Sequence, residues 1–523
     1  MLATVYSRAQ FGMQAPPVTI DVHVSAGLPS LAVVGLAEAA VKEAKDRVRP
    51  AITTSGFQWP PGRVTVNLSP ADLPKEGGRF DLPIALALLA ATCQIPARTL
   101  VPYEFYGELS LGGELRSVRG LLSAICQATL EHHVLIIPRG NTSEAERIAK
   151  AQVVAAANLA EVIGHLRGER TLPYLTTTTV AEPTVSYPDL ADVRGQSHAR
   201  RVLEIAAAGA HSLLMVGPPG AGKSMLAQRL PGILPPLTTA EALETAIVGS
   251  ASSQGFRAEA WSQRPFRAPH HTSSTAALVG GGSQPSPGEI SLAHHGVLFL
   301  DELPEFEREA LEALREPLET GRITISRAAW QSDFPARFQL IAAMNPCPCG
   351  HLGDGTRRCR CSRLSIDRYR ARLSGPLLDR LDLHVRVAPT ELSKLLDSRD
   401  VNDSSAIVRL RVARARARAL ERQGVLNSAL GPGDLESYAH PDHETCNLLQ
   451  FTARRFNLSA RGYGRILRVA RTIADLAARD AVTVEHVSEA LLFRQLDGEG
   501  RDAHLSATPY AGSDESHAAP GVH

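Results

Sequence analysis

The chain has few cysteines, few aromatic residues, almost no net charge and no long apolar run. Of its 523 residues, 7 are cysteine and 5% are aromatic, and 55 Lys and Arg balance 54 Asp and Glu. The near-zero net charge excludes a general electrostatic attraction to nucleic acid, so any DNA contact must come from local basic patches. The longest apolar stretch, residues 82–95, is broken by Pro83, Thr92 and Gln94. It is shorter than the ~20 residues that a membrane helix needs.

The amino-terminal sequence MLATVYSRAQ lacks the apolar segment of a signal peptide. We therefore expect a cytoplasmic protein that has no membrane contact and whose thiols are reduced. In that compartment, clustered cysteines indicate a metal site more often than a disulfide.

The order of apolar patterns along the chain predicts two α/β domains followed by a helical one. Residues 18–24 alternate apolar with polar side chains, as do residues 63–70, and this period is typical of half-buried strands. Apolar helical stretches lie near residues 36–52, 82–92 and 121–130. We expect an N-terminal α/β domain at 1–166, a Pro- and Thr-containing linker at 167–188, a second α/β domain at 189–389, a helical domain at 390–496 and a disordered tail at 497–523.

A phosphate-binding loop is predicted within HSLLMVGPPGAGKSMLAQRL, residues 211–230. The segment has the pattern of an apolar strand, a Gly-rich turn and a helix. Glycines let backbone N–H groups close around phosphate oxygens, and the helix N-terminus adds positive potential. In this pattern Lys223 reaches the β- and γ-phosphates and the Ser224 hydroxyl binds Mg²⁺. We expect ATP to contact Gly217, Pro218, Pro219, Gly220, Ala221, Gly222, Lys223 and Ser224.

Polar residues follow two further apolar strands. GVLFLDELPEF, residues 296–306, ends its strand in an acidic pair. We expect Asp301 to hold Mg²⁺, through water, and Glu302 to activate the water that attacks the γ-phosphate. FQLIAAMNP ends in Asn345, whose amide can hold that water in place. Downstream, Arg380 and Arg461 have an order and spacing relative to these motifs that favours a role at the nucleotide.

The segments GPPGAGKS, LDELPEF, AAMNPCPCG, SGPLLDR and SARGYGRILRVARTIADL together resemble the magnesium-chelatase-like AAA+ ATPases of the YifB/ComM type. The resemblance covers nearly the whole chain except the tail. It implies an AAA+ P-loop core with a parallel sheet, a helical lid and a homo-hexameric ring with ATP between subunits. It also implies that Arg380 is an arginine finger for the neighbour's ATP and that Arg461 is the sensor-2 arginine of the lid. Gly462-Tyr463-Gly464 departs from the family pattern, so we expect a loosened helix start, with Arg465 as an alternative to Arg461.

Related ATPases carry two inserts, which match residues 264–296 and 321–338 here. Both would project into or near the pore of the ring. In the second, an alternating apolar pattern indicates a short hairpin. Its candidate contacts for a DNA strand, by charge and stacking, are Arg322, Arg327 and Trp330. The alternative is a packing hairpin without a ligand.

The N-terminal domain resembles the Lon-type protease domain (S5 domain 2-like fold) at residues 70–89 and 107–125. The position of the nucleophilic serine falls on Arg79, and the position of the catalytic lysine falls on Leu122. Without a nucleophile and an amine base, acyl transfer has no starting chemistry. We therefore expect a non-proteolytic Lon-like domain, serving as a ring platform or a DNA-contact surface.

Four of the 7 cysteines lie in CPCGHLGDGTRRCRC. In an extended chain, residues i and i+2 point to the same side, so each Cys-x-Cys pair can offer two sulfurs to one ion. Four thiolates form a closed structural Zn²⁺ set. We expect Zn²⁺ at Cys347, Cys349, Cys359 and Cys361, with free thiols or a redox role as alternatives.

Two further patterns leave their roles open. The pairs His270-His271 and His294-His295 fit no known metal spacing, so loop hydrogen bonding, a metal and a nucleotide or DNA contact all remain. Arg414, Arg418 and Arg422 share one helix face, which predicts a solvated surface or a DNA contact.

Taken together, the sequence predicts an ATPase that uses ATP and Mg²⁺ and works as a DNA helicase or translocase. The resemblance implies branch migration on recombination or transformation intermediates, with single-stranded or branched DNA as the partner. The alternatives are a chelatase-type chaperone and a protein-remodelling AAA+ chaperone that does not act on DNA.

Overall fold

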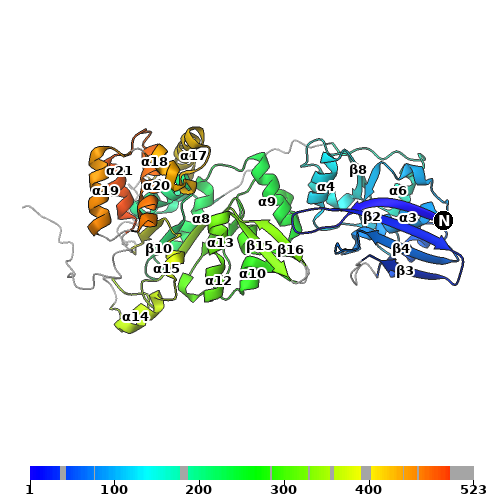
Figure 1. Cartoon of the computed structure of the whole chain (residues 1–523), viewed down its shortest axis with the longest axis horizontal. Helices are drawn as coiled ribbons and strands as arrows, with labels where there is room; N and C mark the ends of the chain where they lie inside the picture. Colours follow the sequence, from blue (N-terminus) through cyan, green and yellow to red (C-terminus); the bar gives the residue numbers. More distant parts are fainter. Residues whose placement is uncertain are drawn as a thin grey trace, which may run out of the picture.

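The chain extends along one axis, with an N-terminal domain at one end, an α/β core in the middle and a set of helices at the other end (Figure 1). The structure is a computed structural model. It describes residues 1–35, 43–75, 77–176, 187–282, 285–327, 330–353, 358–389, 402–439, 441–455 and 459–494. The expected disordered tail at 497–523 lies outside the described residues.

The N-terminal domain is built on a mixed sheet of seven strands in the order β3-β4-β2-β1-β5-β8-β9. Strand β2 pairs antiparallel with both β1 and β4, whereas β5 and β8 pair with their neighbours in parallel. The two strands predicted from alternating residues are β2 and β4, so that prediction is confirmed. The strands are β1 (Leu2–Arg8), β2 (Pro17–Ser25), β3 (Ser30–Val34), β4 (Arg63–Ser69), β5 (Tyr103–Phe105), β8 (Val134–Pro138) and β9 (Val153–Ala156).

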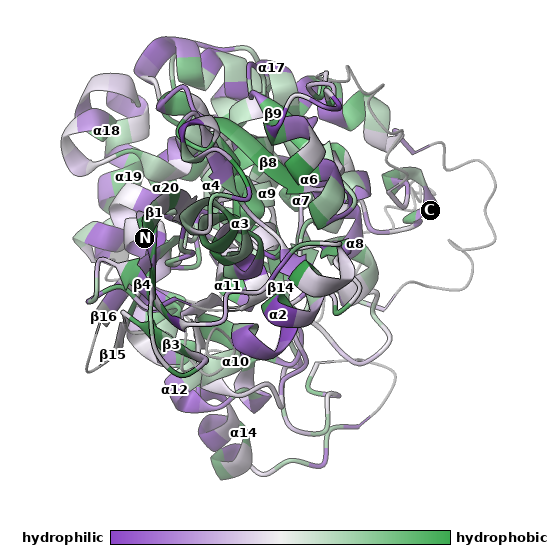
Figure 2. Ribbon diagram, turned by 90° about the vertical axis from the view of Figure 1, so that its right-hand side faces the viewer, coloured by the Kyte–Doolittle hydropathy of each residue, from purple (hydrophilic) through white to green (hydrophobic). Residues whose placement is uncertain are grey.

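Helix α3 (Asp81–Ala91) forms the centre of the N-terminal core. Every residue of α3 is buried, and the helix packs on β1 and β2. A helix that is apolar on all sides is stable in this position because no face of it meets water. In Figure 2, α3 and β8 are green, whereas α2 (Ala44–Thr54) is largely purple. The remaining longer helices of the domain are α4 (Leu121–Leu130) and α6 (Leu159–Leu166).

The N-terminal domain extends beyond its expected end at residue 166. Leu172 is buried in the core of this domain, and the Leu175 N–H donates to the Val153 carbonyl at 2.8 Å. The predicted linker start at 167 is therefore wrong. The segment lacks an apolar period because it contributes two anchoring leucines rather than a regular element.

The middle of the molecule is a parallel sheet of five strands in the order β11-β14-β17-β10-β18. The three central strands, β14, β17 and β10, are buried along their whole length, with helices on both faces of the sheet, which is typical of parallel sheets. The strands are β10 (Leu213–Val216), β11 (Phe266–Arg267), β14 (Val297–Leu300), β17 (Gln339–Met344) and β18 (Leu383–Arg386). The main helices are α7 (Ser197–Gly209), α8 (Lys223–Ile233), α9 (Thr239–Ala251), α12 (Arg308–Ala313), α13 (Arg315–Thr320), α14 (Arg363–Arg370) and α15 (Gly375–Leu378).

Two small insertions interrupt this core. One consists of α10 (Thr275–Val279), β12 (Gly280–Gly281), β13 (Ser286–Pro287) and α11 (Glu289–Leu292). The other is the antiparallel hairpin of β15 (Arg322–Arg327) and β16 (Trp330–Pro335). The predicted hairpin is therefore present.

The N-terminal domain contacts the core through α9 and through the β15–β16 hairpin, among other described residues. Leu243 and Ile247 of α9 pack on the apolar cluster around α4. The turn between β1 and β2 reaches across to β16 (Figure 1), where Gly12 lies so close to Ser332 that a side chain would not fit. The N-terminal domain therefore contacts the β15–β16 hairpin, the same hairpin that holds the candidate DNA contacts.

The C-terminal part is helical: α17 (Ser405–Gln423), α18 (Pro432–Tyr438), α19 (His443–Arg455), α20 (Ala460–Leu476) and α21 (Val484–Leu492). Helix α20 runs unbroken through Gly462 and Gly464, so the expected loosening is wrong. The Ser459 side chain accepts a hydrogen bond from the Gly462 N–H at 3.1 Å, which caps the helix and offsets the cost of the glycines. None of the helices in the described ranges has the length and apolar character to cross a membrane.

Candidate nucleotide site and cysteine cluster

The predicted phosphate loop joins the end of β10 to the start of α8, at the carboxyl edge of the parallel sheet. Gly217 is required because a Cβ atom there would collide with the carbonyl oxygen of Val387. Gly222 has φ +88° and precedes the first turn of α8. A turn of this kind exposes backbone N–H groups at a helix N-terminus, which suits an anionic phosphate.

Lys223 lies folded over this loop. Its Nζ donates to the carbonyls of Gly217 at 2.6 Å and Pro218 at 3.0 Å, and to Asn345 Oδ1 at 3.1 Å. Burial lowers the pKa of Lys223. The three acceptors are neutral, and a desolvated cation gains more from an anionic partner. The structure thus brings Lys223 and Asn345 together where a terminal phosphate would lie.

Ser224 and Asp301 form the second polar pair of the site. The Ser224 hydroxyl donates to Asp301 Oδ2 at 2.7 Å, and the Glu302 N–H donates to Asp301 Oδ1 at 2.9 Å. Mg²⁺ prefers oxygen ligands and keeps several waters, so one hydroxyl and one carboxylate beside a phosphate fit it. When bound, Mg²⁺ would neutralise charge on the phosphates.

Glu302 follows β14 with an unusual backbone. Its φ is +53°, in the left-handed region, and its side chain is half exposed. The carboxylate contacts His271, with Oε2 lying 3.0 Å from Nδ1. No pattern in the sequence indicates this contact, because the histidine lies in a loop of the first insertion.

The two predicted arginines do not lie at the phosphate loop of their own chain. Arg380 and Arg461 line one cavity of about 1400 Å³, whose lining includes no residue of 217–224. Arg380 is ion-paired with Glu319, and Arg461 is exposed.

Arg465, the alternative to Arg461, lines the same cavity. It is buried, and its guanidinium lies 3.5 Å from Asp379 Oδ1. Burial lowers the pKa of Arg465. A buried, acid-paired arginine is less available to a ligand than the exposed Arg461.

Of the three hairpin residues proposed to contact DNA, the structure describes the side chain of one. Arg322 is exposed at the base of β15. Arg327 and Trp330 are paired across the hairpin, and their side chains lie outside the described part of the chain. The inward residues Ile323 and Ile325 are buried with Phe334, so the hairpin also packs on the core.

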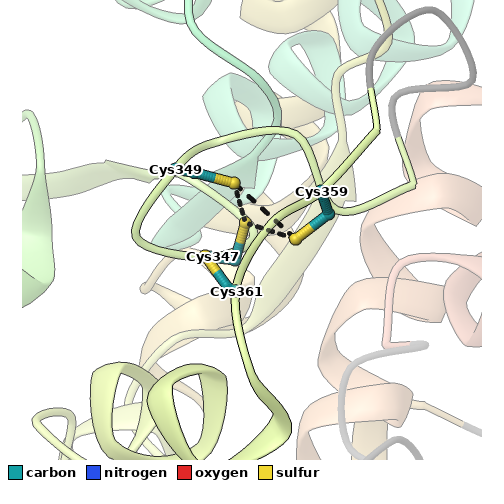
Figure 3. Close-up of side chains that lie close together, drawn as sticks. All are labelled: Cys347, Cys349, Cys359 and Cys361. Atoms are coloured by element: carbon teal, nitrogen blue, oxygen red, sulfur yellow. Dashed lines mark hydrogen bonds between the residues drawn. The ribbon is translucent and has the colours of Figure 1, made fainter.

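The four clustered cysteines converge (Figure 3). The sulfur of Cys347 lies 3.5 Å from that of Cys349 and 3.7 Å from that of Cys359, and all four sulfurs lie within 4.8 Å of one another. Four sulfurs at ~2.3 Å from a tetrahedral Zn²⁺ lie about 3.8 Å apart. Hydrogen bonds from the His351 and Arg360 N–H groups lower the pKa of Cys349 to about 6. The cluster is compatible with Zn²⁺.

The cysteine loop also packs on the phosphate loop. Gly350 has φ +83°, and a Cβ atom there would lie 2.5 Å from Cδ and 2.8 Å from Cγ of Pro219. The two loops are therefore in direct contact, with Asn345 between the sheet and the first cysteine. This contact could not be read from the sequence.

The paired histidines form hydrogen bonds. The Arg337 N–H donates to His294 Nδ1 at 3.0 Å, so the ring proton is on Nε2, which faces Glu244 at 3.1 Å. Neither ring nitrogen of His294 then has a lone pair for a metal. Burial lowers the pKa of His294 to about 4, which keeps it neutral. His295 Nε2 lies 2.8 Å from the same carboxylate. The metal interpretation therefore does not fit His294.

The predicted solvated face of α17 is wrong at one position. Arg414 and Arg418 are exposed, but Arg422 donates to both oxygens of the buried Asp475, at 2.6 and 2.9 Å. Helix periodicity finds the shared face and cannot show which residue meets a carboxylate from another helix.

In the N-terminal domain, the positions expected for a protease nucleophile and base have structural roles. Arg79 is buried and donates to Gln10 Oε1 at 3.1 Å and to the carbonyl of Arg119. Leu122 is buried in α4. Neither position offers a nucleophile or an amine.

Comparison with known proteins agrees with this geometry. Residues 189–395 match the family described as magnesium chelatase, subunit ChlI, residues 402–494 match its C-terminal part, and residues 20–141 match the family described as subunit ChlI of Mg-chelatase. The chain is 50% identical to "Competence protein ComM" of Haemophilus influenzae over 500 residues, which cover 95% of this chain and 98% of the relative. It is 48% identical to "Uncharacterized protein YifB" of Salmonella typhimurium over 496 residues, which cover 95% and 97%.

A phosphate loop at the edge of a parallel α/β sheet, together with these matches, defines a magnesium-chelatase-like AAA+ nucleotide-binding protein. The chain belongs to the YifB/ComM-type family within that class. Membership suggests an ATPase that uses ATP and Mg²⁺.

Proposed function

We propose that the chain is an ATP-driven AAA+ ring motor that acts on single-stranded or branched DNA, as a helicase or branch-migration factor in recombination or transformation. The observation that carries the ATPase part is the pairing of Lys223 with Asn345 and of Ser224 with Asp301, beside Glu302. These groups come from two strand ends and one helix start, and few reactions other than nucleotide hydrolysis need them together.

In this proposal, each residue acts on one part of the hydrolysis. Lys223 and the loop backbone bind the β- and γ-phosphates. Asn345 orients a water molecule, and Glu302 takes a proton from it as its oxygen attacks the γ-phosphorus and ADP leaves. Ser224 and Asp301 would hold Mg²⁺.

The ring part of the proposal is supported by the position of the arginines. Arg380 and Arg461 line a cavity separate from residues 217–224. A second copy that presents its phosphate loop to this cavity would bring both cations to the neighbour's ATP. A closed homo-hexamer satisfies that arrangement for every subunit.

The remaining finer assignments belong to the same proposal. Exposed Arg322 and the β15–β16 hairpin contact DNA, and the chain works in the cytoplasm. The name of the relative, "Competence protein ComM", is in keeping with a role in transformation. The N-terminal domain is a non-proteolytic Lon-like platform, and the C-terminal helices form the lid. A structural Zn²⁺ on the four cysteines fixes the loop that packs on Pro219.

The experiment that tests the proposal is steady-state ATP turnover without DNA, with single-stranded DNA and with a branched junction. We expect stimulation by DNA, largest with the junction, and loss of turnover in Glu302→Gln. Glu309→Gln, an exposed acid on α12, is the matched control and should keep turnover. Turnover that ignores every DNA contradicts the motor and favours the chelatase-type or protein-remodelling alternative.

A further inference from the structure

The cysteine cluster joins two segments that lead away from the candidate nucleotide site. Asn345 directly follows β17, and Cys347 comes two residues after it. At the other end of the cluster, Cys361 is followed by Ser362, whose hydroxyl caps α14 by accepting from the Ser365 N–H at 3.2 Å. One ion on the four sulfurs would therefore tie the segment that follows Asn345 to the start of α14.

Helix α14 is itself anchored beside the same site. Its Tyr369 is buried in the same apolar cluster as Met344, the last residue of β17. Just beyond the helix, Arg372 donates to the carbonyl of Pro304 at 3.1 Å and to Glu305 Oε2 at 2.6 Å, in the turn that follows β14. The helix is therefore held against the ends of the two strands that carry the polar residues of the site.

The cysteine cluster reaches the phosphate loop as well. The Gly350 N–H donates to the carbonyl of Cys347 at 2.9 Å, which closes a tight turn between the first two cysteines and the rest of the loop. A Cβ atom on Gly350 would lie 2.5 Å from Cδ of Pro219, so this turn packs on the phosphate loop without a gap. A displacement of the turn therefore changes a contact that the phosphate loop makes.

The position of the cysteine loop depends on what joins its sulfurs. The three distances among the sulfurs of Cys347, Cys349 and Cys359 are 3.5, 3.6 and 3.7 Å (Figure 3). Thiols are weak donors and weak acceptors, so contacts between sulfurs alone hold the loop loosely. A tetrahedral Zn²⁺ would hold four chain positions at fixed distances, and the binding of such an ion is coupled to local folding.

From these contacts we infer that Zn²⁺ binding at the four cysteines is coupled to the nucleotide site, so that the metal-loaded chain binds ATP more tightly and holds Asn345 in place for hydrolysis. The inference rests on the proposed ATPase function and adds a dependence on metal to it. A coupling between two binding sites is reciprocal, so ATP must tighten metal binding by the same factor. Hydrolysis is affected too, because a displacement of about 1 Å can lower a rate about 100-fold.

The first test measures the coupling without any turnover. The full chain is stripped with a chelator that prefers Zn²⁺ to Mg²⁺ and is then titrated with Co²⁺ in excess Mg²⁺. Absorption from thiolate-to-Co²⁺ charge transfer reports the cysteine site alone, because the Mg²⁺ site has oxygen ligands. A saturating non-hydrolysable ATP analogue should lower Kd for Co²⁺ about fivefold or more, and Co²⁺ should lower Kd for the analogue by the same factor.

Three results of this titration overturn the inference. Kd values that do not respond to the other ligand show that the sites are independent. Absence of the charge-transfer absorption shows that the cysteines hold no metal. Loss of helical circular dichroism on stripping shows that the metal folds the whole domain rather than positioning one loop.

The second test is steady-state turnover with ATP titrated and zinc content measured on the same samples. The stripped chain should have a kcat about 10- to 100-fold lower, and added Zn²⁺ should restore it. Cys361→Ser should lose zinc and resemble the stripped chain. Cys93→Ser, the same change at an exposed thiol outside the cluster, is the matched control and should keep both zinc and kcat.

An unchanged kcat after loss of zinc overturns the role of the metal in holding Asn345. The stripped chain decides this point even if Cys361→Ser does not fold. If the unmodified chain binds the ATP analogue but hydrolyses no ATP, the proposed ATPase function fails, while the Co²⁺ titration still decides whether the two sites are coupled.

Discussion

The contact between the cysteine loop and the phosphate loop predicts that Gly350→Ala weakens nucleotide binding. The substitution places a methyl group 2.5 Å from the Pro219 ring, which is rigid and can move only with the phosphate loop itself. Overpacking of this kind costs about 1–3 kcal/mol. If the phosphate loop takes up the strain, Kd for ATP rises about five- to 150-fold.

Gly353 supplies the control, because its φ of +77° is similar and a Cβ atom added there would meet no other atom within 4 Å. Both substitutions carry the same backbone cost, about 1 kcal/mol for a left-handed alanine, but only the one at Gly350 reaches Pro219. The assay is titration with a fluorescent ATP analogue, with zinc content measured on the same samples. We expect Gly353→Ala to bind within about twofold of the original. Equal weakening by the two variants would refute the reasoning.

Four other outcomes follow from the structure. Arg380→Ala and Lys223→Ala should each be inactive and regain turnover when mixed, whereas a mixture that stays inactive contradicts ATP sites shared between subunits. Cys361→Ser should lose bound zinc by elemental analysis, and a chain that never holds zinc refutes the assignment. Burial raises the pKa of Glu144 to about 7 from 4.5. The contribution of protonated Glu144 to the free energy of unfolding is therefore full below pH 4.5 and is lost as pH rises through 7. Glu144→Gln should flatten that part of the pH profile of the unfolding midpoint. Asp475→Asn leaves two arginines short of a buried partner and should lower the free energy of unfolding in urea by about 3 kcal/mol, and a change below about 1 kcal/mol would contradict this.

Much of the candidate nucleotide site could be predicted because each of its residues lies within a short sequence motif. Each of Ser224, Asp301 and Asn345 stands at a strand end or helix start, and the carboxyl ends of parallel strands meet at one edge of the sheet. The convergence of the cysteines followed in the same way from two residues on one side of an extended chain.

What the sequence could not supply are contacts between segments far apart in the chain. The contact of His271 with Glu302 and the packing of Gly350 on Pro219 depend on how the first insertion and the cysteine loop fold back on the sheet. Helix propensity also misled: the glycines after Arg461 predict a loosened start, yet a serine cap and tertiary packing keep α20 regular.

The measurement that tests the central claim most directly is strand separation on a labelled branched DNA junction. The full chain should separate the junction with ATP and Mg²⁺, and should leave it intact with a non-hydrolysable ATP analogue or with Glu302→Gln. A junction that stays intact while the chain hydrolyses ATP would contradict a DNA motor.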